Sequence, residues 1–305
     1  MSNQRTLKEG ISFKGVGLHT GEPCAVRLKP APAATGIVFH VKDKDVAIAA
    51  SHRAVCDTAF ATTLGANGTR VKTVEHLLAA CAGLGIDNLR IEIEGPEVPI
   101  LDGSSKLFVD SMLMAGIDEQ SSARPRLKVV TPFFFKDADA EITVMPWDGR
   151  CITYQIFYPH KLLGFQEMTF GFEEELFINE IAPARTFGFL KDVQRMKANG
   201  LAKGGSLDNA VILSDTEVIN ASGLRFKDEL LRHKLLDFMG DLLLAGSPVE
   251  GHITASRTGH SSNLKFVSAL LAASDCWRIV SGPEPETAPL DSILGLDRAG
   301  KIRYA

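Results

Sequence analysis

The sequence lacks the features that define several large classes of protein. Its five cysteines are odd in number and show no Cys-x-x-Cys spacing, which argues against a disulfide framework and for a reducing compartment. The formal charge is -4 and the pI is near 6.1, so the basic footprint of a nucleic-acid binder is missing. Apolar runs such as 242–245 are far too short to cross a bilayer, and the polar start at 1–8 shows no signal-peptide core. We therefore expect a cytoplasmic protein with no nucleic-acid partner and no transmembrane segment.

The chain does have enough residues for one large or two medium domains. It has 305 residues, of which 45% are hydrophobic, and its mean hydropathy is close to zero. A polar segment, 116–126, ends in Arg-Pro-Arg and predicts a domain boundary. We expect domains at 1–122 and 127–282, followed by an irregular tail at 283–305 that three prolines mark.

The two halves share an order of strands, helix, strand and helix. The first half predicts strands at 6–13, 25–28, 36–40 and 88–93, and helices from 74 and at 104–115. The second half predicts strands at 127–130, 141–145, 152–158, 166–171 and 252–255, and helices at 227–244 and 261–273. The expected fold is α+β, with two similar two-layer domains, each a sheet packed on helices, and an active site at the domain interface.

An internal match also relates the two halves. Shifting the chain by 157 positions places His76 on His233 and Gly83 on Gly240. The identities are few and the intervening strands lose register, so chance is an alternative explanation. If the helices are equivalent, His76 and His233 should meet at the domain interface.

The predicted helix 227–244 carries the largest group of candidate site residues. His233, Asp237 and Asp241 follow one another at i, i+4 and i+8, so they form one polar stripe on an otherwise apolar helix. Buried carboxylates are costly unless they are paired or hold a metal. An imidazole four residues from a carboxylate suits zinc, although the same spacing also occurs in core hydrogen bonds. The stripe is therefore either a polar core pairing or half of a metal site.

The helix that begins near Val74 offers the other half. It carries Glu75 beside His76, so it adds an imidazole ligand and a carboxylate close to a water on the metal. The arrangement is not that of the His-Glu-x-x-His proteases, because the glutamate precedes its histidine and the second histidine is absent. Cys81 on the same helix is best interpreted as a small buried apolar residue.

Two further segments allow more than one interpretation. The glycine-rich segment 15–21 matches neither the phosphate-loop nor the dinucleotide spacing, and a hairpin turn is the favoured prediction. In 187–205, apolar residues recur near helical spacing before glycines break the pattern. This segment either caps the core or lines a channel for an acyl chain.

Taken together, these motifs resemble the UDP-3-O-acyl-N-acetylglucosamine deacetylases, the zinc amidases of lipid A biosynthesis. The resemblance runs nearly end to end, and a departure such as Ser261-Ser262 lies outside the matched site residues. The segments that carry it are Gln4–Leu7, Gly15–Gly21, Thr73–His76, Gly83–Asn88, Asp102–Ser104, Ala184–Phe189, Arg232–Asp241 and Gly259–His260. It implies hydrolysis of the N-acetyl group of UDP-3-O-(3-hydroxyacyl)-N-acetylglucosamine to acetate and the free amine, an early committed step of lipid A biosynthesis.

The resemblance implies one Zn²⁺ per chain and a ligand set for it. By position, the zinc ligands would be His76, His233 and Asp237, with a fourth place left for water. Glu75 matches the family's general base, and His260 matches its second acid/base group.

Further site residues follow from the same match. Asp241 would orient His260, and Thr186 would help to hold the tetrahedral oxyanion. Lys234, Phe187 and Thr186 would contact the substrate, and a segment of about 187–210 would shape the acyl passage. His19, also shared with the family, either structures its loop or touches the substrate.

Two other function classes stay open from the residues alone. A phosphoesterase would use a similar His/Asp set but usually needs more carboxylates for two metals, and no second cluster is visible in the sequence. A noncatalytic lipid or nucleotide binder would keep the apolar segment but would have no need of Glu75 beside His76. We expect a monomer whose partner is a small glycolipid nucleotide.

Overall fold

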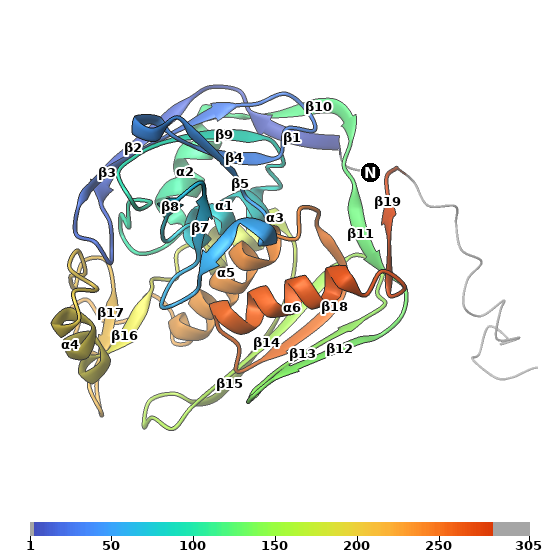
Figure 1. The fold of residues 1–305 in the computed structure, drawn as a ribbon. Helices are drawn as coiled ribbons and strands as arrows, with labels where there is room; N and C mark the ends of the chain where they lie inside the picture. The colour runs from blue at the N-terminus through green and yellow to red at the C-terminus, as the bar shows by residue number, and fades with distance from the viewer. Residues whose placement is uncertain (1–2, 283–305) are drawn as a thin grey trace, which may run out of the picture.

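The computed structural model describes residues 3–282, so the irregular tail expected at 283–305 lies outside the described residues. The α+β class is confirmed. Figure 1 shows sheets of both halves around a central pair of helices, α1 (Glu75–Leu84) and α5 (Glu229–Leu243). Within 3–282, no helix is both long and apolar enough to span a membrane.

The first half is built on a five-stranded sheet. Its order is β2 (Ile11–Val16), β3 (Pro23–Pro30), β9 (Leu89–Glu94), β4 (Ile37–Val41) and β5 (Val46–Ala49). Along β4, Ile37, Phe39 and Val41 are buried while the residues between them are partly exposed, the alternation of a half-buried strand. Helices α1 and α2 (Lys106–Ala115) pack on the buried side, where Phe13 of β2 meets Phe108 of α2. This sheet therefore supports the helix that carries Glu75 and His76.

A small three-stranded sheet precedes α1 and was not predicted. It contains β6 (Val55–Asp57), β7 (Thr63–Ala66) and β8 (Thr69–Val71), after the 3-10 turns η1 (Lys42–Lys44) and η2 (His52–Ala54). Its strands have only three or four residues, too few to show a period-2 pattern. The sheet brings Thr62, just before β7, to the N-terminal end of α1.

The second half is built on a seven-stranded sheet. Its path is β12 (Phe133–Asp137), β13 (Ala140–Met145), β18 (Val249–Ser256), β11 (Arg126–Val129) and β19 (Trp277–Val280), with β14 (Arg150–Tyr158) beside β18 and β15 (Gly164–Gly171) beside β14. Helix α6 (His260–Ala272) and α5 pack against it. Phe238 of α5 stacks on Phe266 of α6 and contacts Tyr154 of β14.

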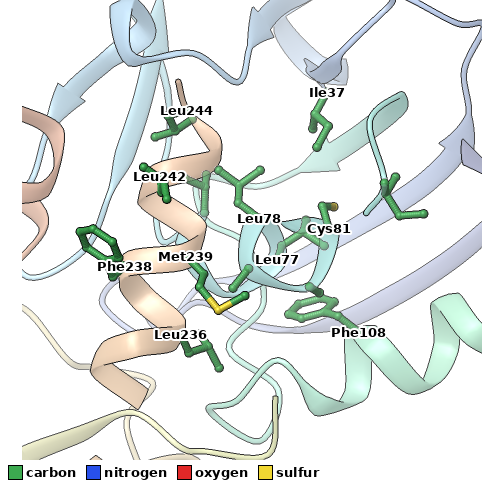
Figure 2. Packing of buried hydrophobic residues seen from close by; sticks show 14 of the residues in the cluster. Ile37, Leu77, Leu78, Cys81, Phe108, Leu236, Phe238, Met239, Leu242 and Leu244 are labelled. Atoms are coloured by element: carbon green, nitrogen blue, oxygen red, sulfur yellow. The ribbon is translucent and has the colours of Figure 1, made fainter. Parts of the chain in front are cut away.

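The two halves meet where α1 packs on α5. Gly240 makes this contact possible, because a Cβ there would lie 2.2 Å from the carbonyl oxygen of Glu75. One apolar cluster continues from the first half into the second, and Figure 2 shows Leu77, Leu78 and Cys81 of α1 close to Met239 of α5. Cys81 is fully buried, and burial raises the pKa of its thiol to about 12, as suits an inert core residue.

One predicted strand was wrong in detail, and one strand was not predicted. The strand expected at 6–13 is two strands, β1 (Asn3–Leu7) and β2, because a bend at 8–10 interrupts it. The polar segment 116–126 contains β10 (Ile117–Ala123), which pairs antiparallel with β1. A partly exposed strand carries many polar residues, so its composition resembles that of a linker. The domain limits 1–122 and 127–282 stay a prediction.

The segment between β15 and α5 begins in the main core and continues into a small separate unit. The short helices α3 (Glu174–Leu176) and η3 (Phe177–Ile181) lead to β16 (Phe187–Phe189), α4 (Leu190–Ala198) and β17 (Val211–Leu213). Strands β16 and β17 pair in parallel, with α4 in the connection between them. Tyr158 of β14 contacts the rings of both Phe187 and Phe189, which joins this unit to the larger sheet.

Candidate metal centre

Three predicted ligands converge from the two central helices. His76 lies on α1, His233 and Asp237 lie one turn apart on α5, and the ligand atoms of all three lie within 4.8 Å of one another. Oδ1 of Asp237 is 3.6 Å from Nε2 of His76 and 3.3 Å from Nε2 of His233. All three residues are buried, so the arrangement is an enclosed three-ligand cluster.

The protonation of these groups suits a divalent metal. Nδ1 of His233 lies 3.0 Å from the carbonyl oxygen of Ala184, so it carries the proton and leaves Nε2 as a free lone pair. Burial lowers the pKa of His76 to about 3 and also lowers the pKa of His233, which keeps both imidazoles neutral. Metal ligation requires neutral imidazoles of this kind.

Asp237 completes the donor set. Burial opposes its ionisation, but nearby cationic groups, Lys234 and His260 among them, outweigh burial and hold its pKa below the usual range. Its Oδ1 is buried and accepts no hydrogen bond from the residues in 3–282. Two neutral imidazoles and one ionised carboxylate with an orphaned oxygen match the ligands of a catalytic Zn²⁺ site.

Glu75 lies beside this cluster at the start of α1. It is buried, and its Oε2 accepts a hydrogen bond of 3.0 Å from the backbone N–H of Thr62. Burial raises the pKa of Glu75 to about 8, and the nearby carboxylates of Asp237 and Asp241 add to the rise. A carboxylate with such a pKa readily exchanges a proton near neutral pH.

His260 and Asp241 form a separate pair on the same side. His260 begins α6, and its Nδ1 donates to Oδ2 of the fully buried Asp241 at 2.9 Å. Burial would lower the pKa of His260, but Asp241 outweighs burial and raises it to about 9. His260 is therefore cationic at neutral pH, with Nε2 as its remaining donor.

The sequence did not predict two residues that contact Asp241 of this pair, Thr62 and Asn263. The hydroxyl of Thr62 donates to Oδ1 of Asp241 at 2.5 Å, and Nδ2 of Asn263 donates to Oδ2 at 2.9 Å. Asn263 follows His260 at i+3 on α6, a spacing that was available in the sequence. No sequence pattern pointed to Thr62, because it lies 179 residues from Asp241 in the chain and only the fold brings the two residues together.

The remaining predicted residues line the same hollow. A cavity of about 200 Å³ is bordered by Thr186, Phe187 and Lys234 as well as by Glu75, His260 and the three ligand residues. Nζ of Lys234 lies 3.3 Å from Oδ2 of Asp237, and this carboxylate raises the pKa of Lys234 despite its burial. The backbone of Thr186 is held by Gly103 and Val211. The structure thus brings every predicted site residue together.

An apolar cavity of about 240 Å³ adjoins this hollow. The two share Leu18, Thr186 and Phe187, and the second cavity continues between α4 and β17. Its apolar walls include Leu190, Val193, Met196, Leu207, Ile212 and Ile219. The apolar stripe of 187–205 therefore faces a cavity rather than the main core.

The glycine-rich segment 15–21 is a hairpin turn between β2 and β3, as predicted. The backbone N–H of His19 donates to the buried Glu97, which also accepts from Thr20 and Thr73. The ring of His19 lines the apolar cavity, and neither of its nitrogens makes a hydrogen bond of good geometry, although the backbone of Phe60 is close. The turn also contacts the segment after α4, where the N–H of Gly204 donates to the carbonyl of Leu18.

Comparisons with known proteins show the family of the chain. The family model of UDP-3-O-acyl N-acetylglycosamine deacetylase (LpxC) matches residues 4–272. The chain is similar to proteins from three bacteria that are named UDP-3-O-acyl-N-acetylglucosamine deacetylase. The Thermodesulfovibrio yellowstonii protein is 44% identical over 93% of this chain and 96% of its own length. The Myxococcus xanthus protein is 45% identical over 91% of this chain and 89% of its own length. The Histophilus somni protein is 42% identical over 95% of this chain and 96% of its own length. The resemblance seen in the motifs is confirmed, and the chain belongs to the UDP-3-O-acyl N-acetylglycosamine deacetylase family.

Proposed function

We propose that this chain hydrolyses the N-acetyl group of UDP-3-O-(3-hydroxyacyl)-N-acetylglucosamine, an early committed step of lipid A biosynthesis, with one Zn²⁺ per chain. The observation that carries the proposal is a single hollow that holds a three-ligand cluster, a buried carboxylate and a cationic imidazole. Amide hydrolysis needs a base for the attacking water and an acid for the leaving nitrogen at the same time. Glu75 and His260 supply these two protonation states from separate helices.

His76, His233 and Asp237 would hold the metal. Bound there, Zn²⁺ supplies Lewis-acid chemistry, polarising the amide carbonyl and making the attacking water more acidic. Lys234 pairs with Oδ2 of Asp237, which leaves Oδ1 directed at the two imidazoles. The Ala184 carbonyl fixes the tautomer of His233 in the form that ligates through Nε2.

Glu75 would take the proton of the attacking water on one of its carboxylate oxygens. The N–H of Thr62 orients this carboxylate through Oε2. The pKa of Glu75 is raised in part by Asp237 and Asp241, so a cation held at the ligand cluster favours its ionised, basic form.

His260 would donate from Nε2, first stabilising the developing oxyanion and then protonating the leaving amine. Asp241 fixes Nδ1 and keeps the ring charged, while Thr62 and Asn263 fix Asp241. Thr186 borders the same hollow and would add its hydroxyl to the oxyanion.

Substrate binding would use both cavities. Phe187 and Lys234 would contact the glucosamine nucleotide part, and the apolar cavity beside α4 would take the acyl chain. A two-metal phosphoesterase is less well supported, because a single His/Cys/Asp/Glu cluster is found in the part of the chain that the structure describes. Cytoplasmic location and the monomeric state stay predictions from the sequence.

The test is acetate release from UDP-3-O-(3-hydroxyacyl)-N-acetylglucosamine with and without a chelator. We expect the chelator to abolish release and one equivalent of zinc to restore it. Glu75→Ala and His260→Ala should each lose at least ~10²-fold in kcat while zinc content, measured by mass spectrometry, stays near one per chain. Release that is indifferent to the chelator, or full activity in either variant, would contradict the assignment.

A further inference from the structure

A third cavity lies on the far side of α5 from the metal centre. Its volume is about 90 Å³, and its apolar lining includes Ile37, Ala82, Ile86, Met239, Leu242 and Val249. At 3.6 residues per turn, Met239 and Leu242 lie on the opposite side of α5 from His233 and Asp237. Figure 2 labels Ile37, Met239 and Leu242 among the buried residues of the core. The cavity is therefore separate from the hollow in which the reaction is proposed.

Three charged residues border this cavity: Asp87, Arg124 and Arg150. Both oxygens of Asp87 are already engaged. Oδ1 accepts from Nε of Arg124 at 2.7 Å, and Oδ2 accepts from the backbone N–H of Arg5 at 2.9 Å. The carboxylate of Asp87 therefore balances Arg124, and one positive charge, that of Arg150, is left over.

Arg150 has no carboxylate within ion-pair contact among the described residues, although Asp87 and Glu250 lie near it. Its Cζ lies 3.5 Å above the ring of Phe172, and its Nε is buried without a hydrogen-bond partner. Within residues 3–282, its side chain makes no hydrogen bond and no ion pair. The nearby carboxylate of Glu250 forms an ion pair with Arg126 at 3.2 Å, and its Oε2 accepts no hydrogen bond from the described residues. Burial lowers the pKa of Arg150 to about 9, and Arg124 contributes to the fall, whereas the carboxylates of Asp87 and Glu250 oppose it. A partly buried guanidinium without a contacting carboxylate is costly, so a bound anion would be favoured.

We propose that this cavity binds a small organic monoanion, a short-chain carboxylate whose oxygens pair with Arg150 and whose hydrocarbon part lies against Met239 and Leu242. The planar guanidinium presents two parallel N–H donors that match a carboxylate. The single unbalanced charge fits a monoanion, and the apolar wall formed by α5 fits a short alkyl tail. A volume of about 90 Å³ suits a molecule of a few carbon atoms.

The probe is sodium butyrate, titrated into the zinc-loaded enzyme. The readout is the methyl NMR signal of Met239, assigned with Met239→Leu, because this methyl group lines the cavity. We expect a saturable shift with butyrate and none with sodium chloride at equal ionic strength. Arg150→Met keeps an apolar stem but removes the charge, so it should weaken butyrate binding at least tenfold.

Controls separate this site from the metal centre, where a carboxylate also has affinity for zinc. Deacetylase activity without butyrate should be unchanged in Arg150→Met. Arg90→Met removes an exposed arginine of β9 that does not border the cavity, and it should bind butyrate as the wild type does. Ala50→Leu, which fills the cavity while leaving Arg150 in place, should also abolish the shift.

Three results would overturn the proposal. If the Met239 shift gave the same butyrate affinity in Arg150→Met as in the wild type, the guanidinium would not be part of the binding site. An equal response to chloride would indicate general screening. A shift with inorganic phosphate but not with butyrate would contradict the carboxylate assignment.

Discussion

At the scale of single residues, the acid of the reaction depends on one carboxylate. Asp241 raises the pKa of His260 to about 9 against the opposing effect of burial. Because His260 must be protonated to act, kcat should fall as pH rises through about 9. In Asp241→Asn the charge is lost, so this basic limb should move to lower pH by at least about one unit. A pH profile of kcat for both proteins checks this, and an unmoved limb would rule out His260 as the titrating acid.

The same pair links pH to stability. The folded-state pKa of His260, about 9, lies above the ordinary histidine value of about 6.5. The contribution of protonated His260 to the free energy of unfolding is therefore fully present below about pH 6.5 and is lost as pH rises through about 9. In metal-free enzyme, the difference in Tm between the wild type and His260→Ala should shrink over that window. A difference that grew with pH would contradict the sign.

Thr62 is the residue whose role only the structure shows. Thr62→Val removes the hydroxyl that donates to Asp241 but keeps the backbone N–H that donates to Glu75. A hydrogen bond to a buried charge is worth about 1.5–3 kcal/mol, so kcat should fall roughly 10- to 100-fold with little change in KM. Thr62→Ser should recover most of the loss. Thr63→Val, at the adjacent buried threonine, is the matched control and should behave as the wild type.

At the scale of elements, the site depends on how closely α1 and α5 approach. Gly240→Ala would place a Cβ 2.2 Å from the carbonyl oxygen of Glu75, and a backbone atom of this kind has little freedom to move. Overpacking typically costs about 1–3 kcal/mol, and we expect the upper end of that range. Denaturant unfolding of the metal-free protein measures it. Gly171→Ala, where an added Cβ meets nothing within 4 Å, should stay within about 0.5 kcal/mol of the wild type.

The element scale also explains which predictions were correct. Helices α1 and α5 have long apolar patterns, so their existence and the stripe His233, Asp237, Asp241 were readable. The strands β6 to β8 and β16 to β17 were missed because three or four residues hold too little pattern. β10 was not predicted as a strand, because its pairing with β1 joins positions more than one hundred residues apart in sequence.

At the scale of the whole molecule, the proposed zinc would join the two halves. His76 belongs to the first half, and His233 and Asp237 belong to the second. A ligand that binds only the folded state raises Tm. Zinc should therefore raise the Tm of protein from which a chelator has removed the metal. The His76→Ala variant should lose most of that gain in Tm. Calorimetry with one equivalent of zinc checks this. An equal gain in His76→Ala would mean that the second half binds the metal without the first.

The sequence by itself determined the family, the α+β class and the identity of the residues predicted for the site, because these are carried by local motifs and helical spacing. Only the tertiary structure decided that Thr62 connects Glu75 to Asp241, that the stripe of 187–205 faces a cavity, and that Nε of Arg150 is buried without a hydrogen-bond partner. Each of these depends on contacts between segments far apart in the chain. Hydrogen bonds and cavities of this kind exist only after packing, so no local pattern encodes them.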